Sequence, residues 1–140
     1  MNEPDTGFFE EIEHTADLAL RCGGPDLEAL FRNAARGMYH LMGVETRELA
    51  AATRHRICLA AEDVEGLLVD WLGELAYLAE TQSLVFEEMT FETLSATRLK
   101  ADLVGKRTPR IDTLIKAVTY HQLKVARSDG GFTATVIFDV

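Results

Sequence analysis

The sequence is poor in the residues that mark several common protein classes. It has only two cysteines, Cys22 and Cys58, without CxxC spacing, so it predicts neither a disulfide scaffold nor a thiolate zinc site. We expect both thiols to be reduced and buried. Basic residues number 14 against 23 acids, and the resulting formal net charge of -9 repels phosphate backbones. Direct nucleic-acid binding is therefore not expected, whereas a cation or a basic protein surface suits this charge.

Long hydrophobic runs are also missing. The most apolar long segment, residues 67–79, is interrupted by Asp70 and Glu74 and is too short to cross a bilayer. Residues 1–7 carry acids where a secretory signal has a basic start and an apolar run, and we expect them to be a flexible N-terminus. We therefore expect a cytoplasmic protein without membrane contact. Residues 8–140 are expected to form a single domain, because a chain of this length can bury one core.

Sequence motifs for autonomous catalysis are absent. The chain has no P-loop, no Rossmann glycine turn, no HExxH helix and no GxSxG nucleophile elbow. The two cysteines lack a recognisable nucleophile setting, and the spacing of the four histidines does not define a triad. Nucleotide chemistry carried out by this chain alone is therefore poorly supported.

Two segments have the periodicity of amphipathic helices. In residues 26–42 the apolar side chains fall three and four positions apart, with Asp26 suited to the N-cap and Gly43 to a left-handed exit. A second apolar stripe, residues 67–78, follows Asp63 as a plausible cap. The sequence therefore predicts two helices, each packed through one face.

The second predicted helix contains two acids and two glycines, which are unusual in an otherwise apolar helix. Asp70 and Glu74 fall opposite the apolar stripe and are expected to face solvent. Gly66 and Gly73 each cost a helix up to about 1 kcal/mol relative to alanine. We expect them to mark close packing against a neighbouring element.

The remaining segments alternate between apolar and polar residues and predict half-buried strands. Residues 128–131 suit a hairpin turn between the run 114–125 and the last strand, which would place His121 and Asp139 on neighbouring strands. The basic segment 105–113 lacks an apolar period and predicts an exposed loop. The expected fold is α+β, a two-layer sandwich with a mixed or largely antiparallel sheet and two main helices on one face. The alternating strand positions are Leu18, Leu20 and Cys22; Ile57 and Leu59; Met89, Phe91 and Thr93; Leu99, Ala101 and Leu103; and Phe132, Ala134, Val136 and Phe138.

Two aspartates could meet at one end of this sheet. Asp17 follows Glu13, His14 and Thr15, and Asp139 follows a run whose alternation puts Phe138 and Val140 on the core face. If their strands are adjacent, two carboxylates with a backbone carbonyl and water form a hard oxygen site for Ca²⁺, Mg²⁺ or Mn²⁺. The alternative is a turn in which Asp17 or Thr15 hydrogen-bonds nearby backbone and His14 is structural.

Lys116 lies in a strand-like run and alternates away from Ile115 and Ala117. One interpretation is a solvated strand lysine, since isolated surface lysines contribute little. The other is a charge partner for the two aspartates or a contact for another protein.

Four separated motifs resemble the archease family. They are FEEIEHTAD at 9–17, LLVDWLGEL at 67–75, KAVTYH at 116–121 and IFDV at 137–140. They occur in the right order and span nearly the whole chain. The resemblance implies an α+β sandwich that activates a GTP-dependent tRNA-splicing RNA ligase, helping it to form a guanylylated histidine and to turn over repeatedly.

The resemblance also implies a set of site residues. A divalent ion would be held by Asp17, Asp139 and the carbonyl or carboxylate of Val140. Lys116 matches a lysine that the family associates with activation. The same motifs contain three further candidates, His14, Thr119 and His121.

The chain departs from the family pattern at Leu18 and Ala19, where Ile-Gly is more usual, and at Gln122, where a small residue is more usual. These changes leave the expected ligands intact. In the expected mechanism an acidic, metal-holding edge docks near the ligase's nucleotide site and places a metal or repositions the GTP phosphates. Two other hypotheses remain: a chaperone-like modulator of RNA-modifying enzymes such as a tRNA methyltransferase, and a metal-dependent hydrolase.

Overall fold

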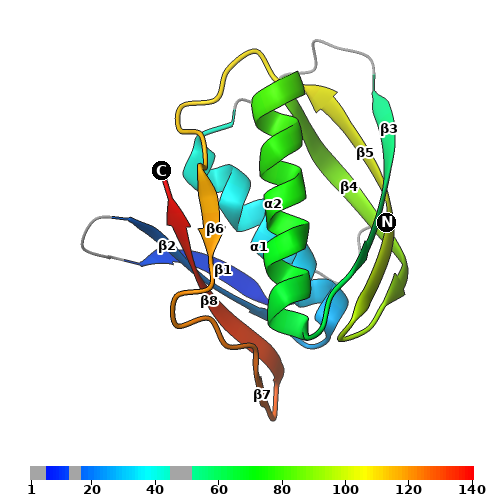
Figure 1. Ribbon diagram of the computed structural model, residues 1–140, viewed down its shortest axis with the longest axis vertical. Coiled ribbons are helices and arrows are strands. Elements are labelled where there is room, and N and C mark those ends of the chain that lie inside the picture. Colours follow the sequence, from blue (N-terminus) through cyan, green and yellow to red (C-terminus); the bar gives the residue numbers. More distant parts are fainter. Residues whose placement is uncertain (1–5, 13–16, 45–51) are drawn as a thin grey trace.

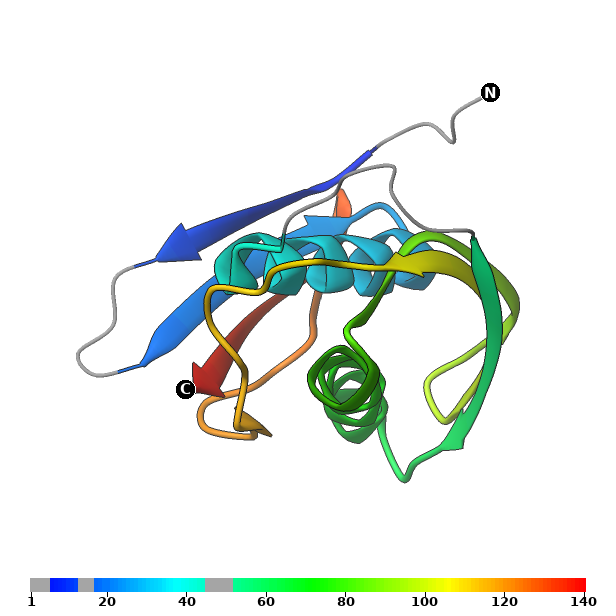
Figure 2. The ribbon, with the colours of Figure 1, turned by 90° about the horizontal axis from the view of Figure 1, so that it is seen from above.

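The computed structural model describes residues 6–12, 17–44 and 52–140. Helix α1 packs on one antiparallel sheet and helix α2 packs against a second, curved one (Figures 1 and 2). The α+β class expected from the sequence is therefore confirmed. The elements are β1 Phe8–Ile12, β2 Leu18–Gly24, α1 Leu27–Met42, β3 Thr53–Ala60, α2 Val64–Gln82, β4 Leu84–Leu94, β5 Arg98–Arg107, β6 Ala117–Thr119, β7 Ala126–Ser128 and β8 Gly131–Asp139.

The strands form two separate sheets. The first has the order β1-β2-β8-β6, with β7 also paired to β8, and the second has the order β3-β5-β4. Every pairing between these strands is antiparallel. The sequence pattern predicted the strands and their largely antiparallel character. It did not predict two separate sheets, because alternation within one strand does not indicate which other strand pairs with it.

Both helices begin where their sequences indicate, and α1 also ends there, whereas α2 continues past the predicted stripe to Gln82. Asp26 accepts a hydrogen bond from the backbone N–H of Ala29 at 2.9 Å, and Gly43 takes the left-handed conformation with φ 65°. Asp63 accepts one from the backbone N–H of Gly66 at 2.8 Å. Each side chain satisfies an amide that has no partner within its helix, so both predicted caps are confirmed.

Helix α1 also ties the first sheet to the second. Its Arg32 donates a hydrogen bond to the backbone oxygen of Met89 in β4 at 2.8 Å. The Tyr39 hydroxyl accepts one from the backbone N–H of Phe86 at 3.3 Å, and burial raises the pKa of this phenol above its ordinary range. The two layers are therefore joined by polar contacts as well as by apolar packing.

Trp71 stands at the centre of the core. Its side chain is fully buried, and its indole N–H donates to the backbone oxygen of Phe31 at 3.0 Å. Its ring lies 5.4 Å from that of Phe91 in β4. One side chain of α2 thus contacts α1 and the second sheet together.

Three expectations about local structure are wrong. Strand β5 continues to Arg107, so only part of the segment 105–113 is a loop, and Gly105 lies buried against Val85 and Phe86. Cys58 is exposed, whereas Cys22 is buried as expected. The run 114–125 is not one strand but contains only β6, followed by a turn.

The hairpin expected at 128–131 is confirmed, because Ser128 of β7 pairs with Gly131 of β8. The flexible stretch expected at residues 1–7 falls largely outside the described residues and stays a prediction. In the part of the chain that the structure describes, no helix is long and apolar enough to cross a membrane.

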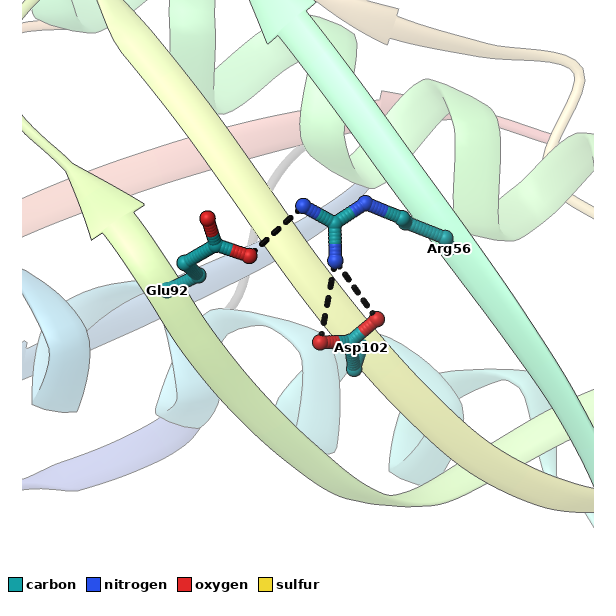
Figure 3. Close-up of polar contacts among 3 residues, drawn as sticks. All are labelled: Arg56, Glu92 and Asp102. Atoms are coloured by element: carbon teal, nitrogen blue, oxygen red, sulfur yellow. Dashed lines mark hydrogen bonds and ion pairs between the residues drawn. The ribbon is translucent and has the colours of Figure 1, made fainter.

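The outer face of the second sheet carries a charge network (Figure 3). Arg56 of β3 reaches across β5, pairing with Asp102 at 2.9 Å and with Glu92 of β4 at 2.6 Å. Hydrogen bonds that Arg56 donates, first to Glu92 and then to Asp102, raise the pKa of its guanidinium, which stays charged. All three side chains are about half exposed, so the network adds little to stability.

Candidate functional site

The two candidate aspartates lie at the same end of the first sheet. In the ladder between β2 and β8, Leu18 pairs with Phe138, so Asp17 and Asp139 occupy the positions next to that pair. Figures 1 and 2 both show the end of β8 beside the start of β2. Asp17 is half-buried and Asp139 is exposed. The convergence expected from the sequence is thus present at the level of strand pairing.

Lys116 borders the same end of the sheet from the other side of β8. Ala117 of β6 pairs with Asp139, and the backbone N–H of Lys116 donates to the backbone oxygen of Asp139 at 2.7 Å. The Lys116 residue is exposed, so its ammonium is accessible to a partner. Three strand ends, those of β2, β8 and β6, therefore bring Asp17, Asp139 and Lys116 to one place, which we call the acidic sheet end.

Two further predicted site residues are Val140 and His14. Val140 follows Asp139 and is 38% exposed, so it does not join the core as its alternation suggested. Val140 directly follows Asp139, so its backbone oxygens adjoin that aspartate. His14 lies outside the described residues, and its assignment stays a prediction.

Thr119 and His121 lie at the opposite end of β6 from Asp139. Thr119 pairs with Ile137, and its hydroxyl accepts a hydrogen bond from the backbone N–H of His121 at 3.3 Å. Gln122 follows with a positive φ of 55°, and the chain turns there. The expectation that His121 and Asp139 occupy neighbouring strands is therefore wrong, because β6 ends before His121.

The chemistry of the acidic sheet end is that of hard oxygen donors. Among the described residues, no three His, Cys, Asp or Glu side chains gather closely enough to hold a metal ion. An ion at this place would therefore need backbone oxygens or water beside the carboxylates of Asp17 and Asp139. Such a donor set fits Ca²⁺, Mg²⁺ or Mn²⁺ better than zinc.

Known proteins match this chain along nearly its whole length. The model of the Archease protein family matches residues 9–140. The chain belongs to the archease family. The resemblance stated from the four sequence motifs is therefore confirmed.

Archease relatives from archaea are similar throughout. Protein archease of Methanosarcina mazei is 35% identical over 140 residues, covering 94% of this chain and 95% of the relative. Protein archease of Methanothermobacter thermautotrophicus is 31% identical, with coverage of 94% and 98%. No large segment is thus unmatched on either side.

Two solved structures resemble the fold. A crystal structure from Thermotoga maritima, described as an archease and possible chaperone, has a TM-score of 0.69 at 22% identity and covers 100% of this chain and 98% of its own. The solution structure of Methanobacterium thermoautotrophicum protein 1598 has a TM-score of 0.66 at 29% identity, with coverage of 94% and 98%. The separation into two sheets and two helices therefore occurs in a fold that other archease chains share.

Sequence reasoning missed a second surface feature of this archease. A groove of about 360 Å³ runs along the outward face of α2, and we call it the α2 groove. Its signal in the sequence was the acids and glycines of the second helix, which were interpreted as a solvated face and close packing. The residues that line it are Leu59, Val69, Asp70, Gly73, Glu74 and Val118.

Proposed function

We propose that this chain is a protein cofactor that activates a GTP-dependent tRNA-splicing RNA ligase, promoting the ligase's guanylylation and its multiple turnover. Family membership supports this proposal. The observation that carries it is the meeting of Asp17, Asp139 and Lys116 at the acidic sheet end. The chain itself would carry out no catalysis, and it would act in the cytoplasm.

A divalent ion would be held by the carboxylates of Asp17 and Asp139 with an oxygen of Val140. Bound there, Ca²⁺, Mg²⁺ or Mn²⁺ would supply a positive charge that polarises or orients phosphate oxygens. The protein's own part is to hold two like charges at neighbouring strand ends, where a cation relieves their repulsion. Lys116 would add a positive charge beside them and contact either the ligase or its bound nucleotide.

Covalent guanylylation of the ligase tests this proposal. The purified ligase of the same organism is incubated with radiolabelled GTP, Mn²⁺ or Mg²⁺ and a substoichiometric amount of this protein. We expect acceleration by the parent chain and its loss in Asp17→Ala and Lys116→Ala. Asp129→Asn and Lys124→Ala are charge-matched controls at exposed positions away from the acidic sheet end, and they should activate normally.

Metal binding is tested separately by titration calorimetry. We expect Mn²⁺ or Ca²⁺ affinity to fall on the order of tenfold or more in Asp139→Asn, because each carboxylate contributes charge to such a site. If Asp17→Ala and Asp139→Asn both bind metal and activate as well as the parent, the assignment of this site is wrong.

A chaperone-like role is the second candidate, and one related structure carries the description of a possible chaperone. It predicts that the protein suppresses aggregation of RNA-modifying enzymes, including a tRNA methyltransferase, without dependence on Lys116. A third candidate, a metal-dependent hydrolase, predicts turnover of GTP or a phosphodiester in the absence of any partner. Running the guanylylation assay without ligase distinguishes it.

A further inference from the structure

The α2 groove lies between the edges of the two sheets. Figure 1 shows α2 with β6 on one side and β3 on the other. Leu59 of β3 and Val118 of β6 supply apolar walls, and α2 supplies the remaining lining, which consists of Val69, Asp70, Gly73 and Glu74. The groove thus combines apolar side chains with two carboxylates on a surface open to solvent.

Gly73 has no packing reason to be glycine. A Cβ built at Gly73 would meet nothing within 4 Å, although the residue lies in the middle of a 19-residue helix. Gly37 of α1 makes the contrast, because a Cβ there would lie 2.6 Å from the Leu20 side chain. Glycine inside a helix costs about 1 kcal/mol relative to alanine. The cost is explained at Gly37 by close packing and has no such explanation at Gly73.

The charges beside Gly73 are also locally unfavourable. Asp70 and Glu74 are one helical turn apart, and like charges at this spacing destabilise a helix by about 0.2–0.5 kcal/mol. Neither carboxylate makes an ion pair with another residue in the ranges that the structure describes. Residues that break local rules without an internal compensation are expected where a surface meets something else.

Two exposed tyrosines lie near the groove. Tyr77, one turn after Gly73 on α2, is 59% exposed. Tyr120 is 60% exposed, and its hydroxyl lies 3.8 Å from the position that a Cβ on Gly66 would take. Tyrosine is enriched among the residues that dominate protein interfaces. Aromatic side chains from α2 and from the segment after β6 therefore lie near the apolar and acidic lining of the groove.

We propose that the α2 groove is the docking surface for a basic segment of the partner protein, in which lysine or arginine flanks an apolar side chain that seats over Gly73. Charge complementarity identifies this occupant, since Asp70 and Glu74 are uncompensated within the described chain and the whole protein has a net charge of -9. The absent side chain at Gly73 leaves room for the partner's apolar group against the helix backbone.

This inference rests on the proposed function, because it takes the partner to be the RNA ligase. The groove also adjoins the acidic sheet end through β6. Val118, which lines the groove, is the neighbour of Ala117, which pairs with Asp139. A partner held in the groove would therefore have the acidic sheet end presented to it in a fixed orientation.

Filling the groove without unfolding the protein tests the proposal. Gly73→Met places a side chain in open space and improves helix propensity, so the melting temperature should rise. Asp70→Asn with Glu74→Gln removes the charges and leaves the shape. Gly130→Ala is the control, because a Cβ there also meets nothing within 4 Å and the residue lies in the β7–β8 turn.

The purified ligase is the probe, and its affinity is measured by titration calorimetry at low and moderate salt beside the guanylylation assay. We expect Gly73→Met to weaken ligase binding at least tenfold, and the neutral double variant to weaken binding and reduce its salt dependence. Gly130→Ala should bind as the parent does.

Binding and activation separate the two proposals. If the parent accelerates guanylylation and Gly73→Met binds the ligase equally well, the groove proposal is overturned and the activator function stands. If the ligase binds through the groove without being accelerated, the groove proposal stands and the activator function fails. If the parent neither binds nor activates an active ligase, both proposals are wrong.

Discussion

The outer face of the second sheet and the acidic sheet end of the first both carry carboxylates, yet the chain compensates them differently. On the outer face, Arg56 holds Asp102 at 2.9 Å and Glu92 at 2.6 Å. At the acidic sheet end, Asp139 makes no ion pair with another residue in the described part of the chain. Its contact with the neighbouring Lys116 is between backbone groups.

This difference separates structural carboxylates from candidate functional ones. In a protein of net charge -9, an uncompensated acid adds to self-repulsion and weakens the compact state. The outer face of the second sheet avoids that cost internally, whereas the described chain supplies no such partner for Asp139. Proximity of acids in the sequence does not distinguish the two cases, and only the positions of the bases do.

Removing the Trp71 side chain should destabilise the packing on which both regions depend. It is expected to lower the free energy of unfolding more than any other change proposed here. Trp71→Ala leaves a cavity between α1, α2 and β4 and deletes the hydrogen bond to Phe31, so we expect a loss of about 3–5 kcal/mol of unfolding free energy. Urea unfolding followed by circular dichroism measures it. Tyr77→Ala, on the exposed face of the same helix, should change the value by less than about 0.5 kcal/mol. Equal effects of the two variants would contradict the assigned core.

The two sheets each contain one cysteine, and the reactivity of the two thiols should differ. Burial raises the pKa of the Cys22 thiol in β2 from 9.0 to about 12, so its reactive thiolate is much scarcer near pH 8 in the folded chain than in the unfolded chain. Cys58 in β3 is exposed. A thiol reagent at pH 8 should modify one cysteine in the native protein and two in urea. Fast modification of both in the native state would contradict the burial of Cys22.

The same shift predicts alkaline destabilisation. The unfolded chain loses the Cys22 proton near pH 9.0, whereas the folded chain keeps it to about pH 12. The stability linked to this thiol is therefore present below pH 9 and is lost as pH rises toward 12. Comparing the melting temperatures of the parent and Cys22→Ala between pH 8 and pH 11 isolates this contribution, since only the parent carries the titrating group. Parallel pH profiles would show that the thiol does not contribute.

Neutralising one acid at the acidic sheet end and one on the outer face of the second sheet should affect ligase activation differently. We expect Asp139→Asn to reduce ligase activation at least tenfold, or about 1.4 kcal/mol in the barrier, without lowering the melting temperature. Asp102→Asn removes a partner of Arg56 and should leave activation unchanged. Guanylylation kinetics and thermal melts of both variants decide the matter. Equal activation by the two would show that charge compensation does not mark the functional acid.

The smallest effect is expected for Arg56→Ala. The guanidinium is exposed and its two ion pairs are accessible to salt, so stability should change little and the change should shrink further at high ionic strength. Melting temperatures at low and high salt measure this. A large, salt-independent loss would mean that the outer network supports the second sheet more than its exposure indicates.

The sequence predicted the features that depend on local patterns. Helix periodicity and the capping residues Asp26, Asp63 and Gly43 located both helices, because caps act within one turn. Alternation located the strands, and the family resemblance implied that Asp17 and Asp139 share one site. Which strand lies beside which depends on contacts between distant segments, so the division into two sheets was not predictable from alternation.

The same limit explains the errors at single residues. Cys58 was expected to be buried because cysteine usually is, but it follows the core residue Ile57 in β3 and so faces outward, where it pairs with Lys100. His121 follows an apolar run, yet the positive φ of Gln122 turns the chain before a strand can continue. Gly73 was expected to mark close packing of the helix against a neighbour, but a Cβ at this position would meet nothing within 4 Å. In each case the residue type favours one environment, and the packing of neighbouring elements decides whether the residue is found there.

The ladder between β2 and β8 also determines when the acidic sheet end comes into being. It pairs Leu18 with Phe138, residues from opposite ends of the chain, and closing so long a loop has an entropic cost that rises slowly with length. Proteins rich in such non-local pairings fold more slowly than those with local contacts. Until this ladder closes, Asp17 and Asp139 belong to segments far apart in the sequence, so the acidic sheet end exists only in the folded molecule. Any function of this sheet end therefore depends on completion of the β2–β8 ladder.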